Sequence, residues 1–131
     1  LMLAAEIPAR LGPDRAREVQ PLKSLLAAGV PLALGSDGPL NPFLNIMFAT
    51  MHPVRPAEAL TREEAVTAYT RGSAFAEGQD KDKGHLSPGA YADLAVLSAD
   101  VFTVPPDQLP GVKSVLTLVG GATVFDGKVL R

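Results

Sequence analysis

The fold of this chain is decided by the stretch Leu25-Leu26-Ala27-Ala28-Gly29-Val30-Pro31-Leu32-Ala33-Leu34-Gly35-Ser36-Asp37-Gly38-Pro39. Residues 30–35 are apolar on both alternating faces, a pattern typical of a parallel strand buried on both sides. Pro31 is tolerated at the start of such a strand, where its missing N–H is not needed for the ladder. We therefore expect a buried strand over residues 30–35 that is followed directly by a carboxylate, Asp37.

A short helix is predicted immediately before this strand, over residues 21–28. Pro21 suits the first helical position and Gly29 suits the residue just past the end. Leu22, Leu25 and Leu26 are spaced to form one apolar face. Because a helix that leads directly into a buried strand is the rhythm of parallel α/β proteins, the sequence favours that fold class. Upstream, Gly12-Pro13-Asp14 opens a short charged turn or helix that reaches Glu18.

Two further helices are predicted downstream of Asp37. Asn41 is a good cap and Pro42 a good first residue for a helix that would bury one apolar set, namely Phe43, Leu44, Met47, Phe48 and Met51. Pro53 and Pro56 then bound a linker. Thr61 and Glu64 form a capping box for a second helix, which we expect to run to about residue 71, to kink at Gly72-Ser73 and to end with a turn over residues 74–77.

The pattern changes after Gly84, where the chain predicts four strands over residues 92–97, 112–119, 122–125 and 128–130. Gly120-Gly121 and Asp126-Gly127 are two-residue hairpin signals between them. The chain is therefore expected to be α/β up to about residue 78 and antiparallel β thereafter.

Composition narrows the function classes. The 131 residues carry a formal net charge of −2, which provides no basic surface for nucleic acid or anionic lipid. The absence of cysteine excludes disulfides, thiolate metal sites and a thiol nucleophile. It also fits a reducing compartment, and we expect a cytoplasmic protein without a signal peptide or membrane span. The first residue is Leu1, which is compatible with a piece of a longer protein.

Five motifs in order carry a resemblance to a known family. They are residues 25–39, Leu60-Thr-Arg-Glu-Glu-Ala65 with Tyr69-Thr-Arg-Gly72, Lys83-Gly-His-Leu-Ser-Pro-Gly-Ala-Tyr-Ala-Asp-Leu-Ala-Val-Leu97, Phe102-Thr-Val-Pro-Pro-Asp107 and Leu116-Thr-Leu-Val-Gly-Gly121. Together they resemble the amidohydrolase superfamily, in the branch of metal-dependent hydrolases related to N-substituted formamide deformylases.

The resemblance implies an α/β fold that is the C-terminal part of a (β/α)8 metal-dependent hydrolase barrel plus the C-terminal segment of its small β-sandwich domain. Residues 1–78 would be the last barrel strand and its helices, and residues 79–131 the sandwich segment. A catalytic ion, zinc or a similar divalent metal, would lie at the carboxyl ends of the barrel strands. The substrate would be a small amide-type molecule.

Asp37 is the candidate site residue. The resemblance implies that Asp37 binds the metal and accepts a proton from the attacking water. The alternative from local sequence is that Asp37 caps the next helix or stabilises the Asp-Gly-Pro turn. We expect Ser36 to hydrogen-bond backbone and Gly38 to permit the turn.

The chain carries only two histidines, His52 and His85, and neither matches a ligand position of the family. Both are interpreted as surface or loop residues, and Asp93 as a residue that holds backbone at the junction of barrel and sandwich. Because a catalytic zinc takes three or more protein ligands, the chain alone is predicted to bind no metal and to be inactive.

Three functions therefore stay open: part of a hydrolase acting on C–N bonds, a non-catalytic truncated module, and a β-rich binding or assembly domain. We expect the unpaired strand edges to bind either the missing N-terminal portion or another copy of the chain.

Overall fold

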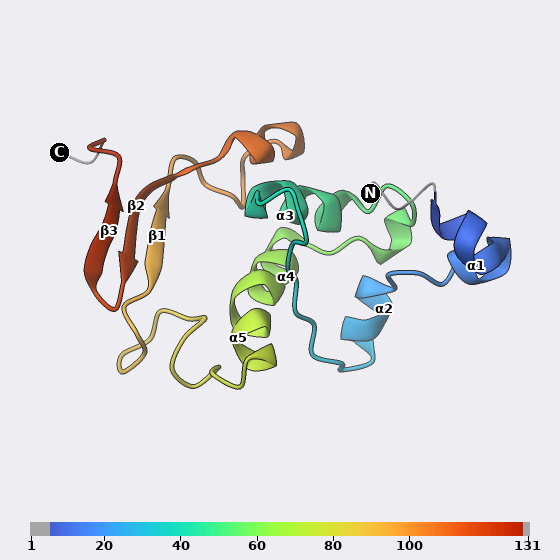
Figure 1. The fold of residues 1–131 in the computed structure, drawn as a ribbon, viewed down its shortest axis with the longest axis horizontal. Helices are drawn as coiled ribbons and strands as arrows, with labels where there is room; N and C mark the ends of the chain where they lie inside the picture. The colour runs from blue at the N-terminus through green and yellow to red at the C-terminus, as the bar shows by residue number, and fades with distance from the viewer. Residues whose placement is uncertain (1–5, 130–131) are drawn as a thin grey trace.

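The computed structural model describes residues 6–129, with a helical part that begins at α1 and a three-stranded sheet at the opposite end of the molecule (Figure 1). The helices are α1 (Glu6–Ala16), α2 (Leu22–Ala27), α3 (Pro42–Met51), η1 (Pro56–Glu58), α4 (Arg62–Thr67), η2 (Ala68–Gly72), α5 (Ser73–Ala76) and η3 (Pro106–Gly111). The strands are β1 (Leu94–Leu97), β2 (Ser114–Val119) and β3 (Ala122–Asp126). None of the helices in the described part is both long and apolar enough to cross a membrane.

The helix α3 begins and ends as its sequence predicts. The Asn41 side chain accepts hydrogen bonds from the backbone N–H groups of Phe43 and Leu44, at 3.0 and 3.1 Å. The predicted buried set is partly wrong, because the buried residues of α3 are Ile46 and Ala49. The reason is that α3 packs on η3 and α4, which cover the face that carries Ile46 and Ala49.

The capping box that opens α4 is also confirmed, with both the Thr61 and the Glu64 side chains bonded to the other residue's backbone. Near Gly72, where a kink was predicted, the structure has one turn of π-helix, η2, and the chain continues into α5 with right-handed helical φ and ψ at Gly72 and Ser73. The single Ser73 hydroxyl proton is shared between the Leu34 carbonyl, at 2.9 Å, and the Ala68 carbonyl inside this turn, at 3.2 Å. The widened turn is thus held by a side chain as well as by backbone.

Residues 30–35 form no strand, so the prediction of a strand buried on both faces is wrong for this structure. Leu32 and Leu34 are half-buried against the core, whereas Ala33 and the other odd-numbered positions are exposed. The segment is attached by the Leu34 N–H, which donates to the Ala68 carbonyl at 3.0 Å. A strand needs a neighbour for its ladder, and the one sheet of the described residues is β1–β2–β3. The barrel itself is therefore not seen.

The antiparallel sheet follows the sequence more closely, with β2 between β1 and β3. Gly120 and Gly121 both have positive φ, at 57° and 80°, which suits the tight turn predicted between β2 and β3. The predicted hairpin at Asp126-Gly127 is wrong for residues 127–129, which are not a strand. There the Asp126 side chain accepts from the Lys128 N–H at 2.7 Å and closes a local turn instead. Residue 130 of that predicted strand lies outside the described residues.

The N-terminal prediction also needs correction, because α1 starts at Glu6 and is broken at Gly12, where φ is 78°.

The main core lies where α3 and α4 meet the segment that connects β1 to β2. Its buried members are Ile46, Ala49, Leu60, Ala65, Val101, Leu109 and Val112. The connecting segment, with η3 in it, is therefore packed firmly on α3, the helix that follows Asp37.

Candidate functional site

Asp37 lies in a tight turn over residues 36–39 and is exposed. The Ser36 hydroxyl closes the turn, since it accepts from the Gly38 N–H at 3.0 Å and donates to the Pro39 carbonyl at 2.8 Å. Gly38 has a φ of 133°, a conformation that side chains with a Cβ rarely adopt. The backbone-bonding role predicted for Ser36 and the turn role predicted for Gly38 are both confirmed.

The structural roles that Asp37 could have taken belong to its neighbours. The cap of α3 is Asn41, and the turn is closed by Ser36. Within residues 6–129, the Asp37 carboxylate has no hydrogen-bond partner. The arrangement therefore leaves a free carboxylate at the end of the 30–35 segment.

A hollow of about 700 Å³ opens beside this segment, between α1 and the C-terminal half of α3. Leu34 and Gly35 form part of its wall, and the lining is mostly apolar. Asp37 is not among the lining residues, so its carboxylate lies outside the hollow.

His52 lies in the loop after α3, as one of its two predicted interpretations has it, but it is buried, so the other interpretation, a surface residue, is wrong. It follows α3 in a left-handed conformation, with a φ of 39°. Its Nδ1 accepts from the Arg55 N–H at 3.0 Å, which leaves Nε2 to carry the proton and donate to the Gln20 carbonyl at 2.9 Å. With both ring nitrogens bonded to the protein, His52 has no free nitrogen for a metal in this structure.

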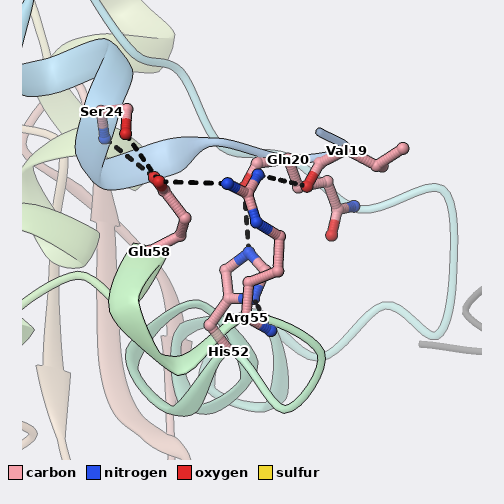
Figure 2. A network of polar contacts seen from close by, with 6 residues as sticks. All are labelled: Val19, Gln20, Ser24, His52, Arg55 and Glu58. Atoms are coloured by element: carbon pink, nitrogen blue, oxygen red, sulfur yellow. Dashed lines mark hydrogen bonds and ion pairs between the residues drawn. The ribbon is translucent and has the colours of Figure 1, made fainter. Parts of the chain in front are cut away.

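A buried carboxylate, Glu58, lies next to His52 in a network that no pattern of the sequence indicated (Figure 2). It accepts from the Ser24 hydroxyl at 2.6 Å and from the Ser24 N–H at 2.8 Å. Arg55 contacts it at 3.4 Å and also donates to the Val19 carbonyl at 3.2 Å. The Ser24 hydroxyl, then its N–H, and Arg55 more weakly, hold the pKa of Glu58 below its ordinary value against the opposing effect of burial.

A second carboxylate ties α2 to α4. Lys23 reaches both oxygens of Glu64, at 2.6 and 2.7 Å. The hydrogen bond from Lys23, followed by that from the Thr61 N–H, lowers the pKa of Glu64. Glu58 and Glu64 thus fix α2, the helix that leads into the 30–35 segment, and neither carboxylate is free for chemistry.

Two candidates remain, His85 and Asp93. His85 is half-buried, and its Nδ1 has no hydrogen-bond partner among the described residues. The Asp93 carboxylate accepts from the Gly120 N–H at 2.6 Å, so it holds backbone as predicted, but at the β2–β3 turn and not at a junction of barrel and sandwich. Residues 6–129 contain no group of three or more His, Cys, Asp and Glu side chains placed to hold a metal ion. Asp37 is therefore not part of such a group among residues 6–129.

Comparison with known proteins identifies the family. The sequence model of the amidohydrolase family matches residues 3–125. The chain belongs to this family. It is 33% identical over 129 residues to YtcJ of Bacillus subtilis strain 168, which is named as an amidohydrolase. It is 30% identical over 115 residues to the N-substituted formamide deformylase of Arthrobacter pascens, and 35% identical over 101 residues to the imidazolonepropionase of Thermoplasma volcanium.

These matches cover most of this chain but only a small part of each relative. They cover 89%, 81% and 76% of the chain, but 24%, 21% and 24% of the three relatives respectively. The chain thus spans about a quarter or less of the length of the curated relatives it matches.

Proposed function

We propose that this chain is the C-terminal portion of a metal-dependent hydrolase that acts on C–N bonds of amides or cyclic amide-like compounds, and that Asp37 is its contribution to the active site. The observation that carries the proposal is the free Asp37 carboxylate, whose possible structural roles are filled by Ser36 and Asn41. Names of the relatives support the reaction class, since they include a deformylase of substituted formamides and an imidazolonepropionase.

The donors of this chain fit such a site only in part. A carboxylate oxygen is a suitable ligand for zinc or a similar divalent ion, but a catalytic zinc takes three or more protein ligands. Because His52 uses both ring nitrogens internally, we assign the remaining ligands to histidines of a barrel portion outside these 131 residues. The chain alone is proposed to bind no metal and to be inactive.

In the complete enzyme the bound ion would polarise the substrate carbonyl and lower the pKa of water. Asp37 then does general-base work: its carboxylate accepts a proton as the water oxygen forms a bond to the carbonyl carbon. The same group returns that proton to the nitrogen as the C–N bond breaks. Its exposure, and the absence of a hydrogen bond to it from the part of the chain that the structure describes, leave both oxygens available for this role.

The exposed apolar residues and the exposed strand β3 support the preceding barrel portion as the partner of this chain. Val30 is 43% exposed, and every residue of β3 is exposed. Strand edges and apolar faces of this kind are normally covered by neighbouring strands. We therefore propose that the preceding barrel portion covers them in the complete enzyme, with a second copy of the chain as the substitute partner when that portion is absent.

The test is Asp37→Asn in the complete enzyme, that is, this chain joined to a histidine-bearing barrel portion. We expect turnover of an N-substituted formamide or a cyclic amide to fall by roughly 10³-fold or more, because the base and one ligand are lost together. In the isolated chain the thermal midpoint should not change, since the Asp37 carboxylate makes no hydrogen bond within residues 6–129. Asp82→Asn, another exposed aspartate in the loop after α5, is the matched control and should retain activity. An Asp37→Asn enzyme with wild-type turnover would refute the proposal.

A further inference from the structure

The turn that carries Asp37 is held at its start by η2 and α5 and at its end by Asn41. At its start, Leu34 is bonded through its N–H to the Ala68 carbonyl and through its carbonyl to the Ser73 hydroxyl, at 3.0 and 2.9 Å. At its end, the Asn41 N–H donates to the Pro39 carbonyl at 2.8 Å. Leu40, between these two residues, is 90% exposed and cannot anchor the turn by packing. The position of the turn's end therefore depends on Asn41.

Asn41 makes two kinds of side-chain contact at once. Its Oδ1 accepts from the first N–H groups of α3, and its Nδ2 donates to the Pro110 carbonyl of η3 at 3.0 Å. The two contacts join segments that lie 69 residues apart in the sequence. A helix cap needs only a hydrogen-bond acceptor. The Nδ2 donor of Asn41 is therefore not needed for capping and serves the contact with Pro110.

The element that receives this hydrogen bond is itself firmly placed. Leu109, next to Pro110, has no exposed surface, and Val112 just after η3 is 6% exposed. Both belong to the core that η3 shares with α3. The Pro110 carbonyl is therefore a fixed point against which the Asn41 amide can hold the turn.

We propose that Asn41 is a positioning residue for Asp37: its side-chain amide fixes the end of the catalytic turn to η3, in addition to capping α3. This inference rests on the proposed function of Asp37. It makes the C-terminal segment, through η3, a part of the support of the active site. Since a displacement of about 1 Å at a catalytic group can cost on the order of 100-fold in rate, loss of the tether should lower kcat by roughly 10- to 100-fold with little change in KM.

Substitutions separate the two contacts of Asn41. Asn41→Ser retains a good cap acceptor but cannot reach Pro110 as an amide does, and Asn41→Asp retains the acceptor but removes the donor. Asn41→Ala removes both contacts. Thr61→Ala is the matched control, because it removes a helix cap at α4 and does not touch the Asp37 turn.

Two measurements test the proposal. The first is amide hydrogen exchange of Gly38 and residue 41 in the isolated 131-residue chain, together with the thermal midpoint. The second is the separate determination of kcat and KM in the complete enzyme. We expect Asn41→Ser and Asn41→Asp to speed exchange at both amides and to lower kcat, and to lower the midpoint less than Asn41→Ala, which loses both contacts. We expect Thr61→Ala to lower the midpoint and leave kcat unchanged.

The outcomes distinguish this inference from the proposed function. If Asp37→Asn is inactive but Asn41→Ser and Asn41→Asp match the wild type in exchange and kcat, the positioning role is wrong and the role of Asp37 stands. If kcat falls equally in Asn41→Ser and Thr61→Ala along with the midpoint, Asn41 is only a stabilising cap and the inference is also wrong. If Asp37→Asn remains active, the proposed function fails.

Discussion

Replacing Gly72 by alanine tests whether the 30–35 segment really packs on the π-helical turn. A Cβ atom at Gly72 would lie 2.0 Å from the Leu32 carbonyl oxygen and 3.1 Å from its carbon. Both are backbone atoms, so no flexible side chain can move aside. The segment would have to retreat by about 1.4 Å to reach the 3.4 Å of an ordinary contact.

Such a retreat breaks the attachments of the segment. The Leu34 N–H to Ala68 carbonyl and Ser73 hydroxyl to Leu34 carbonyl hydrogen bonds, at 3.0 and 2.9 Å, would both be stretched beyond bonding distance. Two lost hydrogen bonds cost about 1–3 kcal/mol, and overpacking costs about 1–3 kcal/mol. Alanine recovers about 0.5–1 kcal/mol through its better helix propensity, because the φ of Gly72 is −62°. The net expectation is a loss of about 1–5 kcal/mol in the free energy of unfolding.

The assay is urea unfolding of the isolated chain followed by far-UV circular dichroism. Gly111→Ala is the matched control, since a Cβ added at Gly111 would meet no atom within 4 Å and the residue has no positive φ. It should be neutral or slightly stabilising. If Gly72→Ala is as stable as Gly111→Ala, the close approach of Leu32 to η2 is wrong, and with it the placement of the segment that leads to Asp37.

Two further predictions concern the buried network around α2. Hydrogen bonds from Ser24 lower the folded-state pKa of Glu58. The ionised Glu58 carboxylate therefore stabilises the fold fully above pH 4.5, its ordinary pKa, and this stabilisation is lost as the pH falls through the lower folded-state pKa. The stability difference between wild type and Glu58→Gln should therefore shrink as urea midpoints are measured below pH 4.5, and a constant difference would contradict the network. His52→Asn should lower the free energy of unfolding by about 1–3 kcal/mol, because it leaves the Arg55 N–H and the Gln20 carbonyl without their hydrogen-bond partners. His85→Asn should lower it clearly less, because the Nδ1 atom of His85 has no partner among residues 6–129. Equal losses in the two thermal melts would contradict the role given to His52.

The sequence predicts best where a structural signal is local. The cap at Asn41, the capping box of Thr61 with Glu64, and the Gly120-Gly121 turn each depend on residues within three or four positions of one another, and all three are confirmed. For the site, the sequence placed Asp37 after the 30–35 segment and indicated the turn role of Ser36, and the structure adds that the Asp37 carboxylate has no partner among residues 6–129. The catalytic role of Asp37 stays a prediction.

The sequence by itself therefore determined the local elements and the family, because helix caps, tight turns and ordered motifs each depend on residues that are close together in the sequence. Only the tertiary structure decided that residues 30–35 form no strand and that Glu58 is buried beside Ser24, 34 positions away. It also decided that His52 is internal and that Asn41 reaches Pro110. The physical reason is that ladder pairing and the burial of polar groups depend on which distant partners are at hand, and no pattern of neighbouring residues specifies those partners.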